Sequence, residues 1–318
     1  MSANVLVTGA AGFVGSHVLR KLIKLGIDCH GVDNFTGASR AHYDHVFEQT
    51  GLDYGYVSAV DIGSSELMQN MVFNPYGPFT HVVHLAATPG VRQSFENPSE
   101  YIENNIRKTQ SFIELLEKQN SVQRVVYAST SNVYSGDPCE EPWREDIVLP
   151  KPINPYGLSK YVNECQFNFS ELHDVGLRFF TVYGPWCRKD MFPYMLMESI
   201  DCNKCVSVFN QGEMYRDFTY IDDIVVGVLL SLTTPNIKPG EIFNLGKGSP
   251  VKLQKFISIV EEAMGSKVDQ IGEGRHPADP IKTWADVSKA GKQFEYDPSV
   301  SIHEGVHKMV KWYKEIYT

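Results

Sequence analysis

Several features are scarce or missing in this chain of 318 residues, and each narrows its possible functions. No apolar run approaches the roughly 18 residues of a membrane span, and the N-terminus lacks the basic and apolar segments of a secretion signal. The six cysteines are scattered, and Cys202 and Cys205, the two that lie close together, lack the further ligands of a zinc site. Basic residues are also fewer than acidic ones, with 29 Lys and Arg against 38 Asp and Glu. The resulting net charge of −9 argues against nucleic acid as a partner. We therefore expect a cytoplasmic protein with reduced thiols, no bound metal, and no membrane or nucleic-acid partner.

The order of the sequence patterns predicts an α/β fold. The segment NVLVTGAAGFVGSHVLRKLIKLG (4–26) begins with a short apolar, β-branched run, turns through glycines and continues at helical spacing to Gly26, a suitable C-cap. Strand-like runs follow at 29–33, 81–87, 124–130 and 175–184, and helical patterns at 101–119, 253–264 and 303–317. Strands that alternate with helices predict a Rossmann-type, doubly wound parallel sheet with right-handed crossovers.

A glycine-rich turn between the first strand and the first helix indicates a dinucleotide site. Gly9, Gly12 and Gly15 permit a tight turn and let backbone N–H groups approach a pyrophosphate at the helix N-terminus. Asp33 ends the next strand, where a carboxylate accepts hydrogen bonds from a ribose diol and repels a 2′-phosphate, which favours NAD over NADP. Asp61 is a candidate acceptor for the adenine amino group, although an ordinary carboxylate at a strand end would look the same.

The stretch NPYGLSKYVNE (154–164) places Tyr156 and Lys160 four residues apart, on one face if it opens a helix. A tyrosine hydroxyl ionises near pH 10 and is a poor base at neutral pH. A nearby ammonium and a positive nicotinamide ring favour the phenolate and lower its pKa. Tyr156 could then take the proton of a substrate hydroxyl while hydride passes to NAD⁺.

Seven motifs identify a family resemblance that covers nearly the whole chain: TGAAGFVGS, HLAATPGVR, YASTSNVY, PYGLSK, RFFTVYGPW, RDFTYIDDI and FNLG, in this order. The chain resembles the extended short-chain dehydrogenase/reductases, specifically the nucleotide-sugar epimerases and dehydratases. The resemblance implies that Thr130 bonds the same sugar hydroxyl as Tyr156. It also implies a homodimer joined through a four-helix bundle, with the helix 101–119 and the helix opened by Tyr156 as candidates.

The resemblance and the change of texture past residue 180 together predict two domains. The NAD-binding Rossmann domain is expected at 1–180 plus 216–240, and a smaller mixed α/β lobe for the nucleotide sugar at 181–215 plus 241–318. The NAD-binding residues implied are Gly9, Gly12, Phe13, Val14, Gly15, Asp33, Asn34, Asp61, Ile62, Leu85, Ala86, Ala87, Tyr156 and Lys160. The substrate-binding residues implied are Pro89, Arg92, Thr130, Ser131, Asn132, Tyr156, Thr181, Arg188, Arg216, Arg275 and Asp279.

Arginines are expected at the diphosphate and uridine, because their planar forks match phosphate oxygens in bidentate fashion. Arg216 and Arg188 match arginines of the family's motifs. Arg275 fits less well, since family members often have the arginine three residues before the aspartate equivalent to Asp279, where this chain has His276. An arginine in an ordinary surface salt bridge would look the same in the sequence.

The two residues after Thr130 discriminate among the reactions that start with oxidation at the sugar's C4. The 4,6-dehydratases have Asp-Glu there, and the decarboxylases that form UDP-xylose usually have Glu second. This chain has Ser131 and Asn132, and neither side chain acts as an acid or base near neutral pH. We therefore expect epimerisation, in which hydride leaves C4, the keto sugar turns, and hydride returns to the opposite face.

Three segments, TPGVRQSFENP, TVYGPWCRKDM and GEMYRDFTYIDDI, resemble the UDP-glucuronic acid 4-epimerases most closely. The keto intermediate of a hexuronic acid is a β-keto acid that loses CO₂ readily, so the site needs neutral donors to hold the carboxylate. The candidates are Thr130, Ser131, Asn132 and Thr181. One departure is Asn132, where that subfamily generally has Ser. We expect conversion of UDP-glucuronate to UDP-galacturonate; the alternatives are a UDP-glucose or UDP-pentose 4-epimerase, a UDP-glucuronate decarboxylase and a regulator that senses NAD without catalysis.

Overall fold

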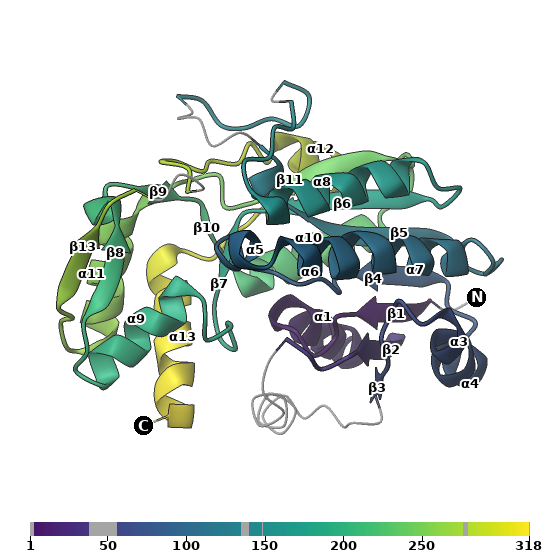
Figure 1. Ribbon diagram of the computed structural model, residues 1–318, viewed down its shortest axis with the longest axis horizontal. Coiled ribbons are helices and arrows are strands. Elements are labelled where there is room, and N and C mark those ends of the chain that lie inside the picture. The colour runs from purple at the N-terminus through teal and green to yellow at the C-terminus, as the bar shows by residue number, and fades with distance from the viewer. Residues whose placement is uncertain (1–2, 38–55, 135–139, 148, 276–278, 318) are drawn as a thin grey trace. The chain divides into compact units, whose positions relative to one another are not determined.

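The structure is a computed structural model and describes residues 3–37, 56–134, 140–147, 149–275 and 279–317. It contains a seven-stranded sheet of order β11-β6-β5-β4-β1-β2-β3 and the two-stranded sheets β10-β7, β12-β9 and β13-β8 (Figure 1). The strands are β1 (Asn4–Thr8), β2 (Asp28–Asp33), β3 (Val57–Ala59), β4 (His81–His84), β5 (Arg124–Thr130), β6 (Asp174–Phe179), β7 (Thr181–Tyr183), β8 (Val206–Phe209), β9 (Tyr215–Arg216), β10 (Phe218–Tyr220), β11 (Glu241–Leu245), β12 (Val251–Lys252) and β13 (Gln270–Glu273).

The large sheet is doubly wound, which confirms the predicted fold class. From β1 the chain continues to β2 and β3 on one side, and β4 and β5 then follow on the other side of β1. The neighbouring pairs β2–β3, β1–β2, β1–β4 and β4–β5 are all parallel. The strand order therefore reverses between β1 and β4, and in open α/β sheets ligands bind outside the carboxyl ends of the strands at such a point.

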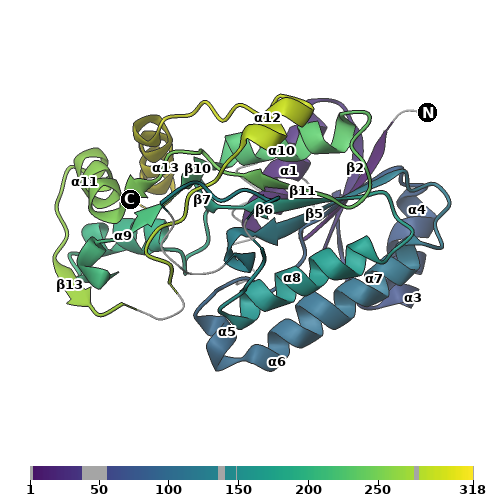
Figure 2. The same cartoon turned by 90° about the horizontal axis from the view of Figure 1, so that it is seen from above.

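Helices cover both faces of this sheet, with α1 and α10 on one face and α7 and α8 on the other (Figure 2). Helix α1 ends at Lys24, and Gly26 has a φ of +68°, the left-handed conformation that glycine supplies after a helix. In the described part of the chain, none of the helices combines the length and the apolar character of a membrane span. The helices are α1 (Phe13–Lys24), α3 (Ser65–Met68), α4 (Asn74–Tyr76), α5 (Gln93–Glu96), α6 (Pro98–Tyr101), α7 (Lys108–Leu116), α8 (Pro155–Asn168), α9 (Phe192–Asp201), α10 (Ile221–Thr233), α11 (Leu253–Met264), α12 (Ser288–Phe294) and α13 (Ile302–Tyr317), with π-helical η2 (Gln69–Phe73) and η3 (Ile102–Arg107) and 3₁₀-helical η4 (Ser131–Val133) and η5 (Asn210–Gly212).

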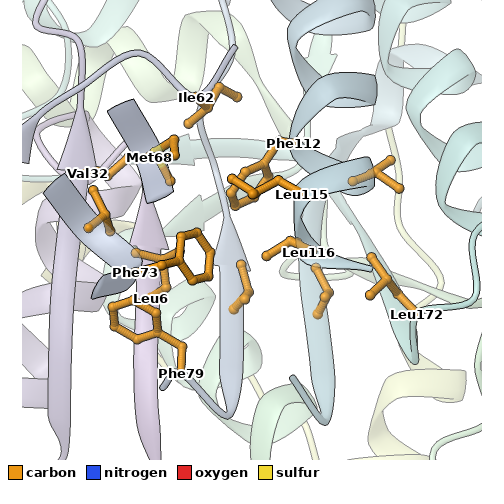
Figure 3. Packing of buried hydrophobic residues seen from close by; sticks show 14 of the residues in the cluster. Leu6, Val32, Ile62, Met68, Phe73, Phe79, Phe112, Leu115, Leu116 and Leu172 are labelled. Carbon is orange, nitrogen blue, oxygen red and sulfur yellow. The ribbon is translucent and has the colours of Figure 1, made fainter. Parts of the chain in front are cut away.

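A hydrophobic cluster fastens α7 and η2 to the sheet (Figure 3). Three of its residues are fully buried: Leu6 of β1, Phe112 of α7, and Phe79, which lies just before β4. The rings of Phe73 and Phe79 meet edge to face, with their centroids 5.6 Å apart. Burial of one such side chain contributes roughly 1.5–3 kcal/mol, so this packing stabilises the helices against the strands of the sheet.

Two predicted elements differ in detail. The helix expected at 101–119 spans α6, η3 and α7, from Pro98 to Leu116, with a π-helical middle. The strand expected at 175–184 is divided into β6 and β7, which belong to different sheets. The division follows from hydrogen bonding, because the backbone N–H of Phe180 donates to Leu245 while that of Thr181 donates to Asp217.

The structure divides into two compact units with other boundaries than expected. Unit 1 comprises Met1–Tyr134, Pro150–Arg178 and Val225–Phe243, and unit 2 comprises Ser135–Leu149, Phe179–Ile224 and Asn244–Thr318. Segments 135–149, 179–180 and 216–224, which the sequence analysis placed in the first domain, therefore belong to unit 2, and 241–243 to unit 1.

Long-range hydrogen bonds to backbone groups account for this division. The carboxylate of Asp217 accepts the backbone N–H of Lys247 at 2.7 Å, which ties the segment around residue 217 to the later part of the chain. The backbone N–H of Trp143 donates to the carbonyl of Trp284 at 2.7 Å. Neither pairing joins residues that are close in the sequence, so composition alone does not reveal it.

Candidate active site

The glycine turn between β1 and α1 has the close packing that a dinucleotide loop needs. Gly9 has a φ of +68°, and a Cβ there would lie 2.7 Å from the backbone nitrogen of Ala86. A Cβ on Gly15 would overlap the carbonyl oxygen of Gly9. Gly12 is the N-cap of α1, and the first turn of that helix carries no acidic side chain. The helix therefore presents its positive end directly at the end of β1.

The loop after β4 is fastened to β1 by a buried threonine. The hydroxyl oxygen of Thr8 accepts the backbone N–H groups of Leu85 and Ala86, each at 3.2 Å, so its own proton is directed to His84 Nδ1 at 2.8 Å. Burial, together with the charge of Lys160, lowers the pKa of His84 to about 3 and keeps the ring neutral. This network positions the predicted NAD residues Leu85, Ala86 and Ala87.

One carboxylate, Asp33, ends β2, and another, Asp61, follows β3. Asp33 accepts the backbone N–H groups of Ala11 at 3.0 Å and Phe35 at 2.8 Å, so it ties the end of β2 to the glycine turn. Burial raises the pKa of Asp33, against the effect of these hydrogen bonds. Asp61 accepts from Asn34 Nδ2 at 2.9 Å and forms an ion pair with Lys108 at 2.7 Å.

The pKa of Asp61 reflects two opposing effects. Burial acts to raise it, and hydrogen bonds from Lys108 and Asn34 outweigh burial and hold it below its ordinary value. Lys108 could not be predicted as the partner of Asp61, because 47 residues separate the two. Of the other predicted NAD residues, Phe13 and Ile62 are buried and Val14 is half-buried.

Tyr156 and Lys160 lie on successive turns of α8, as the sequence predicts. The Asn154 side chain caps this helix by accepting the backbone N–H of Gly157 at 2.7 Å, and Pro155 occupies the first helical position. Tyr156 is half-buried, and its ring meets that of Tyr101 edge to face, with centroids 6.2 Å apart. Lys160 is 2% exposed. Burial lowers the pKa of Lys160 to about 8, and the charge of Glu164 partly offsets that effect.

Glu164 belongs to a buried network that sequence reasoning missed. Arg178 of β6 donates to it through Nε and Nη2, both at 2.8 Å, and Ser129 Oγ donates at 2.6 Å. The guanidinium also lies 4.7 Å from the ring centroid of Tyr134. An arginine inside an otherwise apolar strand, "VGLRFF", was the available signal, since buried charges need partners.

Thr130 ends β5 and is the N-cap of η4. Its hydroxyl oxygen accepts the backbone N–H of Asn132 at 3.2 Å and Asn132 Nδ2 at 3.0 Å. The Asn132 carbonyl oxygen Oδ1 accepts from Asn154 Nδ2 at 3.4 Å. Thr130 and Ser131 are both buried. The amide of Asn132 thus bonds Thr130 and Asn154.

The remaining predicted substrate residues of unit 1 lie on the segment after β4. The carbonyl of Pro89 accepts the Tyr101 hydroxyl at 2.8 Å, and Arg92 is exposed just before α5. Asn105 of η3 accepts the backbone N–H of Thr88 at 2.7 Å and donates to Ser159 Oγ at 3.0 Å. A buried asparagine in a π-helical segment thus joins this loop to α8.

The other predicted substrate residues belong to unit 2. Thr181 begins β7, and Arg188 forms a bidentate ion pair with Asp190, with Nε–Oδ1 at 2.9 Å and Nη2–Oδ2 at 3.1 Å. Arg216 Nη1 donates to the backbone carbonyl of Tyr215 at 2.9 Å. The exposed Arg275 donates from Nε to the carbonyl of Asp279 at 3.3 Å. Within the described ranges, no three His, Cys, Asp or Glu side chains gather as a metal would require.

Comparison with known proteins identifies the family. The model of the NAD dependent epimerase/dehydratase family matches residues 5–246. A UDP-glucuronate 4-epimerase of Thermodesulfobacterium geofontis is 37% identical over 321 residues, which cover 98% of this chain and 96% of that protein. UDP-glucuronate 4-epimerase 2 of Arabidopsis thaliana is 36% identical, with 99% of this chain and 76% of that protein covered.

Solved structures agree with the sequence relatives. The UDP-glucuronic acid 4-epimerase of Bacillus cereus, in complex with UDP-glucuronic acid and NAD, superposes with a TM-score of 0.89 at 33% identity, covering 99% of this chain and 100% of that one. A UDP-glucose 4-epimerase of Thermotoga maritima, with UDP-glucose, gives 0.87 at 28% identity, with 99% and 100% covered. By its glycine turn, its Tyr-Lys helix and these matches, the chain belongs to the NAD dependent epimerase/dehydratase family.

Proposed function

We propose that this protein interconverts UDP-glucuronate and UDP-galacturonate by NAD-dependent epimerisation at C4. The observation that carries the proposal is the combination of Tyr156 and Lys160 on α8 with Thr130 at the end of β5, where no acidic side chain follows Thr130. The named relatives act on the same substrate class.

The glycine turn of unit 1 fits NAD. The missing side chains of Gly9, Gly12 and Gly15 let α1 begin close to the strand end, and a pyrophosphate would accept N–H groups of its first turn. The Asp33 carboxylate already accepts two hydrogen bonds, from the backbone N–H groups of Ala11 and Phe35. Because a carboxylate accepts about four hydrogen bonds, a ribose diol can still bind Asp33. The further NAD residues proposed are Phe13, Val14, Asn34, Asp61, Ile62, Leu85, Ala86 and Ala87.

When bound, NAD accepts hydride from C4 of the sugar and later returns it. Tyr156 takes the proton of the C4 hydroxyl, and the ammonium of the buried Lys160 stabilises the phenolate that does so. Thr130 hydrogen-bonds the same oxygen and holds the sugar for transfer. On return, Tyr156 gives the proton back to the oxygen as hydride reaches the opposite face of C4.

The residues beside Thr130 support epimerisation over elimination or loss of CO₂. Ser131 and Asn132 neither donate nor accept a proton readily near neutral pH, so nothing there protonates a leaving hydroxyl or removes a C5 proton. We propose that Ser131 and Thr181 donate to the hexuronate carboxylate and that Arg188, Arg216 and Arg275 bind the diphosphate and uridine. Pro89, Arg92 and Asp279 complete the proposed substrate contacts.

The test is proton NMR of UDP-glucuronate with the purified protein. We expect signals of the 4-epimer to grow to equilibrium without a UDP-pentose. A Tyr156→Phe variant should bind NAD and lose roughly 10²- to 10⁴-fold in turnover, because it lacks the general base. Tyr161→Phe on the same helix is the matched control and should keep full activity.

The second candidate is a UDP-glucose 4-epimerase, which the Thermotoga maritima neighbour favours. Rapid equilibration of UDP-glucose with UDP-galactose, without turnover of UDP-glucuronate, would establish that reading instead. If turnover by the Tyr156→Phe variant were within tenfold of that by the wild type, both epimerase assignments would be contradicted.

We further propose a homodimer through α8 and the helices from Pro98 to Leu116. These helices lie side by side in both views (Figures 1 and 2), and they expose Ile102 at 59% and Leu158 at 51%. Light scattering should give twice the chain's mass, and Leu158→Glu should give a monomer. A monomeric wild type would refute the dimer without affecting the proposed reaction.

A further inference from the structure

The Thr130 hydroxyl is constrained in the direction of its hydrogen bonds. A hydroxyl has one proton to give and two lone pairs that accept. The Thr130 oxygen accepts two N–H groups, both of Asn132: the backbone at 3.2 Å and the side-chain amide at 3.0 Å. With both lone pairs engaged, the hydroxyl takes part in a further hydrogen bond by donating its proton.

The orientation of the Asn132 amide is fixed from the other side. Asn154 Nδ2 donates to its carbonyl oxygen at 3.4 Å, so the amide nitrogen is the atom that meets Thr130. Asn154 in turn accepts the N–H of Gly157 at 2.7 Å, in the first turn of the helix that carries Tyr156. One chain of hydrogen bonds therefore runs from the start of α8 to the Thr130 hydroxyl.

Backbone packing makes the same connection independently. A Cβ on Gly157 would overlap the carbonyl oxygen of Asn132 and would lie 3.0 Å from its carbonyl carbon. The start of α8 thus lies directly against residue 132, and any side chain at 157 would push the two apart. Tyr156 and Thr130 are held in one rigid arrangement that includes Asn132.

We propose that Asn132 is a positioning residue that makes Thr130 an obligate donor to the reacting oxygen of the sugar. The inference rests on the proposed function, which supplies that oxygen. An obligate donor cannot receive the proton of the C4 hydroxyl, so that proton has Tyr156 as its single acceptor. A serine at position 132 would not impose this direction, because its hydroxyl accepts as readily as it donates.

The inference differs from a carboxylate-binding role for Asn132, and the two roles predict different kinetics. A residue that holds the substrate carboxylate affects KM for UDP-glucuronate whether or not Thr130 has a hydroxyl. A residue that acts through Thr130 affects kcat, and only when that hydroxyl is present. A double-mutant cycle on positions 130 and 132 separates the two.

The experiment measures kcat and KM of wild type, Asn132→Ala, Thr130→Val and the double variant in the purified, NAD-loaded protein. Loss of the donor in Thr130→Val should lower kcat by about 10²-fold. Asn132→Ala removes one hydrogen bond and should lower kcat by about tenfold with KM within about twofold. The double variant should match Thr130→Val. Asn74→Ala, an exposed asparagine on α4, is the matched control and should equal wild type.

Two results would overturn the proposal: a further tenfold loss on adding Asn132→Ala to Thr130→Val, or a rise in KM at unchanged kcat. Asn132→Ser, run through the same cycle, guards against an alanine variant that does not fold. If the protein turned over UDP-glucose but not UDP-glucuronate, the assigned substrate would be refuted, and the same double-mutant cycle on UDP-glucose would still test Asn132. Absence of turnover with every UDP-sugar would refute both the proposed epimerase function and the proposed role of Asn132.

Discussion

Lys160→Met should stabilise the protein while abolishing turnover. Lys160 is 2% exposed, and burial lowers its pKa from 10.5 to about 8. One pKa unit corresponds to about 1.4 kcal/mol, so at pH 7 the buried charge costs the fold about 3 kcal/mol. Methionine fills similar space without charge, and Glu164 keeps its ion pair with Arg178. We expect the free energy of unfolding to rise by roughly 2–3 kcal/mol at pH 7.

The pH dependence gives this prediction its sharpest test. Between pH 8 and 10.5 the unfolded chain still holds the Lys160 proton whereas the folded protein has released it, so wild-type stability rises with pH relative to the variant. The difference should shrink by about 2 kcal/mol between pH 7 and 9.5. The assay is urea unfolding of NAD-free protein, followed by tryptophan fluorescence.

Lys311→Met, at a side chain 77% exposed, is the control for this measurement and should change stability by no more than about 0.5 kcal/mol at either pH. The reasoning is refuted if Lys160→Met is less stable than wild type at pH 7, or if its advantage does not narrow at pH 9.5. Either result would mean that the fold does not oppose the Lys160 charge.

Further predictions concern the groups that hold the site together. Gly15→Ala places a methyl against the carbonyl of Gly9 and should weaken NAD binding at least tenfold, as measured by calorimetric titration. Glu164→Gln leaves the buried Arg178 without its counter-ion and should lower stability by about 3 kcal/mol in urea unfolding. Asp217→Asn replaces an acceptor of three backbone N–H groups by an amide that also donates, and should cost about 2 kcal/mol by the same assay.

Local pattern was enough to predict the Rossmann sheet and the glycine turn between β1 and α1. Strand β5 and helices α11 and α13 occur where the sequence patterns place them, within one residue, and the stretch that carries Tyr156 opens a helix. The glycine turn was predictable because glycine adopts the positive φ of Gly9 without strain, and because a residue without a Cβ permits the close backbone approaches at Gly9 and Gly15. Each of these signals involves residues that are close together in the chain, so a single sequence is enough to detect it.

Long-range pairing could not be predicted in the same way. The run "VGLRFFTVYG" is mostly apolar and β-branched or aromatic on both sides of Phe180, so it contains no mark of the change of partner there. Asp217 reads as part of a family motif, yet its carboxylate binds backbone groups 30 to 68 residues away. The role of Asn132 was also hidden, because its type suggests a donor to substrate and its bonds to Thr130 and Asn154 exist only in the folded chain.

The carboxylate that the Tyr-Lys helix does contain, Glu164, cannot replace the acid and base that are missing after Thr130. Its oxygens accept two hydrogen bonds from Arg178 and one from Ser129, all in the interior. To take a proton from the sugar, Glu164 would have to leave a buried ion pair, and breaking such a pair costs about 3–5 kcal/mol. Held in place, its charge favours the ammonium of Lys160, one helical turn away, against burial. In the proposed mechanism, the network thus supports the charge that the phenolate of Tyr156 needs while withholding a base from the keto sugar, and this combination favours return of the hydride over elimination.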